Sequence, residues 1–267
     1  MISEYLLPNE SRETEARLTG FEAIYDGWSK AQLANVGVTE GWKCLEVGGG
    51  SGSIARWLAE RVGTAGQVVV TDLDPRMLQG LASHNLEVRR HDIVRDELEA
   101  DTFDLIHARM VLTHLREREQ VIGRLVQALR PGGWLVLEDS DMKYMAVLDS
   151  TTADAQTLIE KVSWAATEAL RKGGFDPDWG SRQYAALRRG GLVDVAAAGH
   201  VTTCDADSPG TELFRASYRL LRDQMIDTGV ITSAELDAWY AATTEPSFAW
   251  FSPLLISTRG RRPATAA

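Results

Sequence analysis

Cysteine is scarce in this sequence, with only Cys44 and Cys204 among 267 residues. Two cysteines supply neither the disulfide framework of a small secreted protein nor a C-x-x-C metal-binding pair. We expect Cys44, which lies in an apolar run, to be a small core residue. A chain of this length can bury a full hydrophobic core, so its stability does not require disulfides.

Basic residues and long apolar runs are also in short supply. The chain has 28 Lys and Arg against 38 Asp and Glu, a net charge of −10. This excess argues against a nucleic-acid partner, because proteins that bind the phosphate backbone usually carry a basic face. No run approaches the ~20 apolar residues of a membrane helix, and the first residues lack the apolar segment of a signal peptide. We therefore expect a soluble, cytoplasmic protein with no membrane partner, and a homodimer is the assembly left open.

Glycine, by contrast, is concentrated in one stretch. Residues 44–47 form an apolar run of strand length, and Gly48, Gly49, Gly50 and Gly52 follow at once. The next apolar side chains have helical spacing: Ile54, Trp57, Leu58 and Val62. Strand, glycine turn and helix open a nucleotide-binding βαβ unit, in which the backbone approaches the ligand and the helix N-terminus faces it.

The spacing within this stretch bears on which nucleotide it binds. A dinucleotide site requires G-x-G-x-x-G, whereas the sequence from Gly48 is G-x-G-x-G, and Glu46 stands two residues before it. A pyrophosphate gains nothing from that carboxylate, but a positively charged ligand does. The pattern favours S-adenosylmethionine (SAM), although the glycines alone also allow NAD or FAD.

Strand and helix patterns alternate through the first 140 residues, which predicts an α/β fold with a doubly wound parallel sheet. The expected strands are 44–47, 68–71, 86–90, 103–108 and 134–138, followed by 193–203 and 248–258. The expected helices outside this core are 11–28, 29–35, 152–172, 181–189, 211–228 and 234–242.

Several strand ends carry side chains that suit a nucleoside, and ligands of such sheets bind beyond these ends. Asp72 can accept both ribose hydroxyls; Asp74 is the alternative, but it also suits a helix N-cap. Leu73 and Met77 offer an apolar surface to adenine. Glu46 can attract the methionyl ammonium.

The third and fourth strands end in further candidates. The carboxylate of Asp92 can accept from the adenine amino group, and the Ile93 backbone N–H can donate to a ring nitrogen. Ala108 can face the methionyl part through its backbone carbonyl. Arg109 can bind the cofactor carboxylate or an acidic substrate.

These motifs, in this order, resemble the class I SAM-dependent methyltransferases, most closely the bacterial small-molecule type. The matching segments are E-V-G-G-G-S-G (46–52), V-V-V-T-D-L-D-P (68–75), H-D-I (91–93), F-D-L-I-H-A-R-M-V-L-T-H-L (103–115) and L-R-P-G-G-W-L-V-L-E-D (129–139). The resemblance implies a Rossmann-like, seven-stranded sheet with an antiparallel last strand at 248–258. It implies cofactor roles for Glu46, Gly48, Gly50, Asp72, Leu73, Asp92, Ile93 and Ala108.

The resemblance also implies an organisation for the whole chain. We expect one methyltransferase domain over 1–267, with cap helices at 1–40, a SAM-binding core at 41–140, and lid helices with the sixth strand at 141–247. An N-terminal segment over the site is common in this family, and Tyr5 and Arg17 resemble the aromatic and basic residues that such a segment places near the methionyl end.

Methyl transfer from a sulfonium requires alignment and a dry pocket more than activation by the protein. A general base is needed only for a hydroxyl or carbon acceptor, and His114 is our candidate. Glu138, Asp139 and Asp141 are alternatives, and we expect no metal there because a further ligand set is lacking.

The substrate itself is not specified by these motifs. Trp28, Asp141, Trp164 and Tyr218 are our candidates for contacting a small molecule, plausibly a secondary metabolite. The alternatives are a cyclase or decarboxylase of the same fold, an NAD-dependent oxidoreductase, and a non-catalytic SAM-binding subunit.

Overall fold

The computed structural model describes residues 12–264, which form two compact units. The helical unit comprises 12–25, Asp141–Asp178 and His200–Leu254, and the sheet unit comprises Asp26–Ser140, Trp179–Gly199 and 255–264. The expectation of a single domain over 1–267 stays a prediction.

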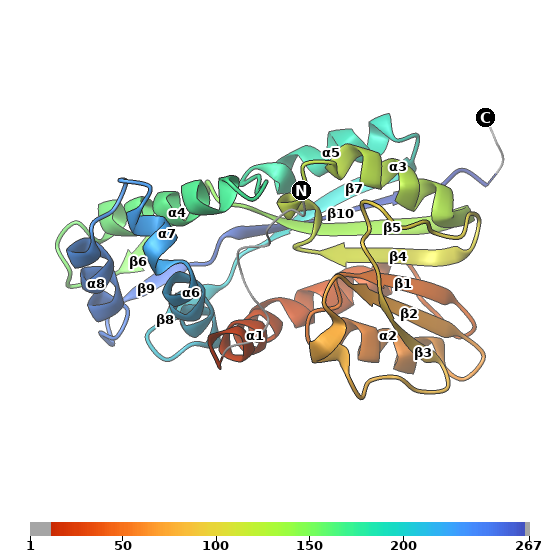
Figure 1. The fold of residues 1–267 in the computed structure, drawn as a ribbon, viewed down its shortest axis with the longest axis horizontal. Helices are drawn as coiled ribbons and strands as arrows, with labels where there is room; N and C mark the ends of the chain where they lie inside the picture. The colour runs from red at the N-terminus through yellow and green to blue at the C-terminus, as the bar shows by residue number, and fades with distance from the viewer. Residues whose placement is uncertain (1–11, 265–267) are drawn as a thin grey trace. The chain divides into compact units, whose positions relative to one another are not determined.

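The sheet unit contains seven strands in the order β3-β2-β1-β4-β5-β10-β7 (Figure 1). Their bounds are β1 Lys43–Val47, β2 Gln67–Asp72, β3 Leu86–Arg90, β4 Phe103–Arg109, β5 Leu129–Asp141, β7 Val193–His200 and β10 Leu254–Arg261. Strands β3 to β5 are joined by parallel pairs. This is the predicted doubly wound sheet, and its switch point lies between β1 and β4, where such sheets bind ligands.

The last strand, β10, runs antiparallel to β5, as predicted. Gly132, near the start of β5, donates its N–H to the carbonyl of Arg262 (3.0 Å), just beyond the end of β10. Ser257, near the start of β10, donates its hydroxyl to Glu138, near the end of β5. The two strands therefore run in opposite directions.

The predicted strands 193–203 and 248–258 were each wrong in length, because each divides into two. The end of the first segment forms β8 (Thr203–Asp205), and the beginning of the second forms β9 (Ala249–Phe251). These two short strands pair with each other and with β6 (Val147–Asp149) in a separate three-stranded sheet. Pro253 separates β9 from β10, and it has no N–H to continue a ladder.

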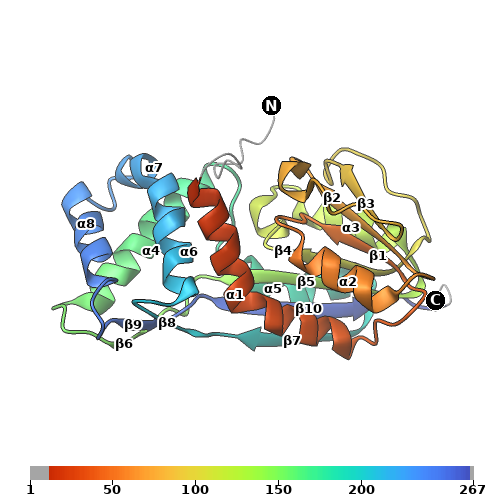
Figure 2. The same cartoon turned by 90° about the horizontal axis from the view of Figure 1, so that it is seen from below.

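Helices cover both faces of the seven-stranded sheet (Figures 1 and 2). The helices are α1 Arg12–Asn35, of which the part from Asp26 belongs to this unit, α2 Ser53–Val62, α3 Arg118–Ala128 and α5 Trp179–Arg189. Cys44, Leu105 and Val136 belong to the core beneath α1 and α2, so Cys44 is a core residue as expected. Leu45 and Ile106 belong to the core beneath α3 and α5.

Helix α1 is continuous, so the predicted pair of helices at 11–28 and 29–35 was wrong. Ser29 was expected to begin the second helix. It is instead fully buried in the middle of α1, and its hydroxyl donates to Glu138 of β5 rather than capping a helix end. A serine within a helix is tolerated when its hydroxyl finds such a partner.

The helical unit is built around aromatic side chains. Its helices are α4 Ala155–Arg171, α6 Pro209–Leu220, α7 Arg222–Ile226 and α8 Ser233–Ala242. Ring centroids lie 4.9 Å apart between Tyr218 and Trp239 and 4.8 Å apart between Phe214 and Trp250. The predicted helix 211–228 divides after Leu220 into α6 and α7. The capping box of Thr232 and Glu235 at the start of α8 is confirmed.

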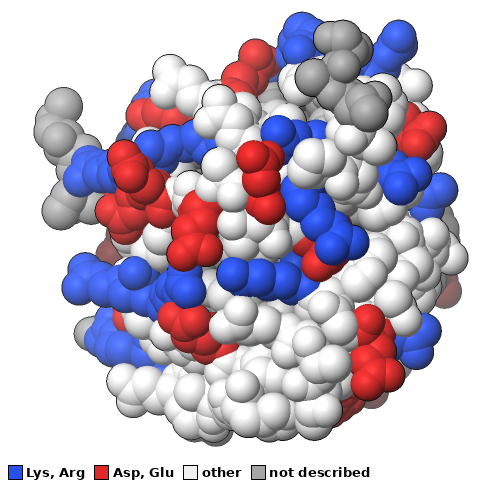
Figure 3. Space-filling model, turned by 90° about the vertical axis from the view of Figure 1, so that its right-hand side faces the viewer, with Lys and Arg blue, Asp and Glu red and all other residues white. Residues whose placement is uncertain are grey.

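None of the helices within residues 12–264 combines the length and the apolar character needed to cross a membrane. On the face drawn in Figure 3, basic and acidic side chains are interspersed rather than gathered by sign.

Candidate functional site

The glycine loop between β1 and α2 folds back against the end of β2. The N–H groups of Gly48 and Gly49 both donate to the carbonyl of Thr71, at 2.8 and 3.0 Å. Gly48 has φ +72°, and a Cβ there would lie 2.3 Å from Cγ2 of Val111. Gly50 has φ +56°. The turn therefore requires glycine for both its conformation and its close contacts.

Asp72, at the end of β2, is bonded directly to this loop. One carboxylate oxygen accepts from the Gly50 N–H (3.3 Å) and the other from the Asp74 N–H (2.9 Å). Burial raises the pKa of Asp72 from its ordinary value, although these N–H groups oppose the shift. Each oxygen retains a lone pair that can accept from a hydroxyl group. Leu73, directly after it, is 45% exposed, and Met77 is half-buried.

Asp92 holds its own turn after β3. Its carboxylate accepts from the Val94 N–H (3.0 Å) and lies 3.5 Å from the Arg95 guanidinium. Ile93 is buried in the core beneath α3 and α5. The carboxylate of Asp92 therefore has a local structural role, and contact with adenine stays a prediction for both residues.

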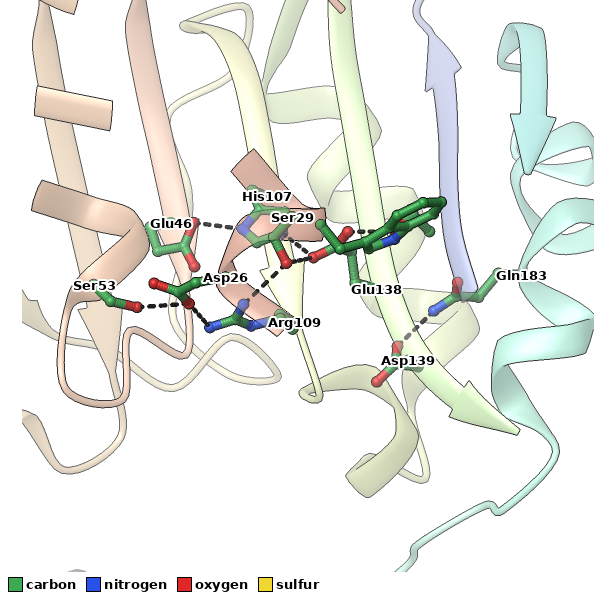
Figure 4. A network of polar contacts seen from close by, with 11 residues as sticks. Asp26, Ser29, Glu46, Ser53, His107, Arg109, Glu138, Asp139 and Gln183 are labelled. Atoms are coloured by element: carbon green, nitrogen blue, oxygen red, sulfur yellow. Dashed lines mark hydrogen bonds and ion pairs between the residues drawn. The ribbon is translucent and has the colours of Figure 1, made fainter. Parts of the chain in front are cut away.

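Glu46 belongs to a fully buried chain of charges across three strands (Figure 4). Its Oε2 lies 2.7 Å from Nδ1 of His107 on β4, and the Nε2 of the same ring lies 3.2 Å from Oε2 of Glu138 on β5. All three side chains are at most 4% exposed. They point to the same face as Cys44, Leu105 and Val136, one step nearer the carboxyl ends, so the apolar core of this face gives way there to charge.

The charges of Glu46, His107 and Glu138 stabilise one another. Burial alone would lower the pKa of the His107 imidazole, but the two glutamates raise it to about 9. Burial alone would raise the pKa of Glu138, but the hydrogen bond and charge of His107 hold it below its ordinary value. His107 is therefore a cation at neutral pH between two carboxylates.

Helix α1 extends this network toward the glycine loop. Arg109 at the end of β4 donates to Ser29 (2.9 Å) and to Asp26 (2.9 Å). Asp26 also accepts from the hydroxyl of Ser53 (3.0 Å), the first residue of α2. The guanidinium of Arg109, expected to be available to an acidic ligand, is thus paired with an aspartate that belongs to α1.

The remaining predicted site residues of the sheet unit are Ala108, His114 and Trp28. Ala108 is fully buried on β4. His114 is half-buried and ends a short 3-10 helix, Leu112–His114, immediately after β4. Trp28 is half-buried on α1 and donates its indole N–H to Ser257 (2.6 Å).

The candidates of the helical unit have different surroundings from one another. Tyr218 is buried among the aromatic rings of that unit, whereas Trp164 on α4 is 63% exposed. Asp141 is buried and accepts from the N–H of Lys143 (3.0 Å). The Nε of Arg17 is buried without a hydrogen-bond partner among the described residues. Tyr5 lies outside the described residues.

Part of the sheet unit is similar to a known family. Residues 45–135 match the family model of a methyltransferase domain. Over these residues the chain carries a methyltransferase domain, as the sequence predicts.

Two curated relatives and one solved structure illustrate the similarity. The chain is 31% identical over 131 residues to methyltransferase str2 of Strobilurus tenacellus (48% of this chain, 47% of str2). It is 32% identical over 123 residues to the ubiquinone/menaquinone biosynthesis C-methyltransferase UbiE of Laribacter hongkongensis (42% of this chain, 49% of UbiE). The chain thus spans about half the length of the curated relatives it matches.

The solved structure is phosphoethanolamine N-methyltransferase 2 of Haemonchus contortus, in complex with phosphomonomethylethanolamine and S-adenosylhomocysteine. It superposes on this protein with a TM-score of 0.58 and 15% sequence identity. The superposition covers 98% of this chain and 60% of the Haemonchus chain. At this identity the similarity concerns the fold alone.

Asp26, Ser29 and His107 belong to the buried network but were not among the predicted site residues. Asp26 and Ser29 look like ordinary polar residues of an amphipathic helix, and no local pattern marks them. His107 does carry a signal, because central parallel strands are nearly continuous apolar runs. A histidine within the run Phe103-Asp104-Leu105-Ile106-His107-Ala108 is therefore an exception that indicates a buried partner.

Asp139, next to Glu138 on β5, points to the opposite face of the sheet. It is fully buried and accepts from the backbone N–H of Thr113 (3.3 Å) and from Gln183 (2.5 Å). Glu138 and Asp139 therefore do not converge, and no group of three or more potential metal ligands is found among the described residues.

Replacing Asp139 with asparagine is expected to stabilise the protein increasingly as the pH rises. Burial, opposed by Thr113 and Gln183, raises the pKa of Asp139 to about 8, against about 4 in an unfolded chain. Between these values the folded state holds a proton that the unfolded state releases, so wild-type stability falls with rising pH. Urea unfolding of Asp139→Asn should give a gain of about 1–3 kcal/mol at pH 7.5 that fades toward pH 4. A gain independent of pH would contradict the assignment.

Proposed function

We propose that this protein transfers the methyl group of SAM to a small molecule. The observation that carries the proposal is Asp72, an acid at the end of β2 whose carboxylate is bonded to the N–H of Gly50 in the glycine loop. A ribose placed on that carboxylate lies against the loop and beside the N-terminus of α2. Glu46, two residues before the loop, supplies the negative charge that a dinucleotide would not favour.

The residues of the methyltransferase domain divide the cofactor among them. Asp72 accepts from the ribose hydroxyls, and Leu73 and Met77 provide an apolar surface for adenine. The carboxylate of Asp92 accepts from the adenine amino group, and the backbone N–H of Ile93 donates to a ring nitrogen. Gly48, Gly50 and Ala108 offer backbone groups. When bound, SAM supplies the activated methyl group.

The charged end of SAM is the α-amino acid of its methionyl part. Glu46 offers a carboxylate to the ammonium. Asp26 and Arg109 form an ion pair, and their side chains are 14% and 9% exposed. The negative charge of Asp26 suits the ammonium of an α-amino acid, and the positive charge of Arg109 suits its carboxylate.

A small-molecule acceptor is supported by the names of the relatives. UbiE is named for a C-methyltransferase of quinone biosynthesis, and the Haemonchus enzyme is named for phosphoethanolamine. His114, directly after β4, is the candidate base for an acceptor that must lose a proton. Trp28, Asp141, Trp164 and Tyr218 remain the candidates for contact with the acceptor.

Calorimetric titration with SAM, S-adenosylhomocysteine and NAD tests the proposal. We expect SAM and S-adenosylhomocysteine to bind and NAD not to bind. Binding of NAD without SAM would overturn it in favour of an oxidoreductase. SAM consumption can then be followed with panels of quinone, phenol and amine acceptors. Product formation without loss of the methyl group from SAM would favour the cyclase or decarboxylase alternative.

A further inference from the structure

The buried ring of His107 has no place in the proposed chemistry, yet both of its nitrogens are occupied. Nδ1 faces Glu46 at 2.7 Å and Nε2 faces Glu138 at 3.2 Å. A neutral imidazole carries a proton on only one nitrogen. It would leave the other lone pair facing a carboxylate in a site without solvent. Both nitrogens therefore donate, and the ring is a cation.

Glu138 is the fixed end of this arrangement. Its carboxylate accepts from the hydroxyls of Ser29 on α1 and Ser257 on β10 as well as from His107. Ser29 in turn accepts from Arg109, and Ser257 accepts from the indole of Trp28. Three donors from three elements leave Glu138 little freedom, so it holds the imidazole ring in one orientation.

Glu46 is the end that this orientation controls. His107 binds its Oε2, and the second oxygen points away from the ring (Figure 4). Glu46 lies two residues before the glycine loop. A continuous series of contacts connects Glu46, before the glycine loop, to Ser53, just after it. The series runs through His107, Glu138, Ser29, Arg109 and Asp26.

We infer that His107 is a positioning residue, which holds the carboxylate of Glu46 in the orientation that receives the ammonium of the cofactor. The inference rests on the proposed function. It predicts that His107 affects ligands with an α-amino acid and leaves ligands without one unaffected.

A pair of ligands separates positioning from general structural damage. S-adenosylhomocysteine carries the α-amino acid, and 5′-methylthioadenosine shares the nucleoside and thioether without it. In the His107→Gln variant, we expect the Kd of S-adenosylhomocysteine to rise about tenfold or more, as for loss of a charged hydrogen bond. The Kd of 5′-methylthioadenosine should change by less than about twofold.

Thr71→Val is the matched control. Thr71 donates its hydroxyl to the backbone carbonyl of Glu46 (3.2 Å), so the variant disturbs the end of β1 without touching the carboxylate. It should change the two dissociation constants by the same factor. Equal losses in His107→Gln would overturn the inference and leave the proposed function standing. Failure of the wild-type protein to bind either SAM or S-adenosylhomocysteine would instead overturn the proposed function.

A measurement on the wild-type protein serves if His107→Gln does not fold. With ¹⁵N-labelled histidine, the ring nitrogens of His107 should have the chemical shifts of a doubly protonated imidazole at pH 7.5. Saturation with S-adenosylhomocysteine should move the Nδ1 resonance, and 5′-methylthioadenosine should not. Equal responses to the two ligands, or no response to S-adenosylhomocysteine, would overturn the inference.

Discussion

Replacing His107 with alanine is expected to lower the free energy of unfolding by about 3–5 kcal/mol. The imidazole is fully buried and lies within hydrogen-bond distance of Glu46 and Glu138. Its removal leaves two carboxylates in one buried site without the cation between them. Chemical denaturation at pH 7.5, with the slope against denaturant unchanged, measures the loss.

A second substitution tests whether charge, rather than the lost ring, causes this effect. Adding Glu46→Gln to His107→Ala removes one of the two uncompensated anions. The double variant should therefore be more stable than His107→Ala alone, although Glu46→Gln by itself is destabilising. A coupling energy of about 1 kcal/mol or more is expected for such neighbours. Additive losses would show that a cavity, not repulsion between carboxylates, governs the cost.

The sheet could be predicted from the sequence because its physical cause is local. Strands buried on both faces need continuous apolar runs, and the glycine loop needs positive φ at Gly48 and Gly50. Both leave a mark in adjacent residues. The antiparallel last strand came instead from the resemblance to a family, since nothing local to 248–258 reveals its direction. The division of that segment does have a local cause, because Pro253 lacks the N–H that would continue the ladder.

The buried network could not be predicted, because its cause is not local. Ser29, Glu46, His107, Glu138 and Ser257 are brought together by the order of the strands and by α1 lying across them. In the sequence, Glu46 is an acid before a glycine loop and Ser29 is the first residue of a predicted short helix. Their actual partners lie 61 and 109 residues away.

The candidate site is intermediate between these cases. The position of Asp72 at a strand end follows from the sequence, and the structure places it on the glycine loop. Arg109 was correctly placed at the end of a strand, but its pairing with Asp26 required knowledge of which helix covers it. The acceptor-binding residues are least predictable, since the helical unit that contains Trp164 and Tyr218 lacks the repeated pattern of the sheet.

Replacing Asp72 with alanine is expected to weaken SAM binding by about 10- to 100-fold, or about 1.5–3 kcal/mol. The variant loses the acceptor for the ribose hydroxyls. It also releases the N–H of Gly50, which the carboxylate now holds at 3.3 Å. Calorimetric titration of the folded variant with SAM and with S-adenosylhomocysteine should give the same factor for both, because they share the ribose.

Asp74→Ala is the control, because Asp74 is the other acid at the end of β2. Its carboxylate is occupied by the guanidinium of Arg76 at 2.8 Å and by the N–H of the same residue at the start of a short 3-10 helix. Its loss should change SAM affinity by less than about twofold, in the range of a surface substitution. A strong effect at Asp74 with none at Asp72 would exchange their roles. Comparable weakening in both variants would mean that the turn as a whole, rather than one carboxylate, recognises the ribose.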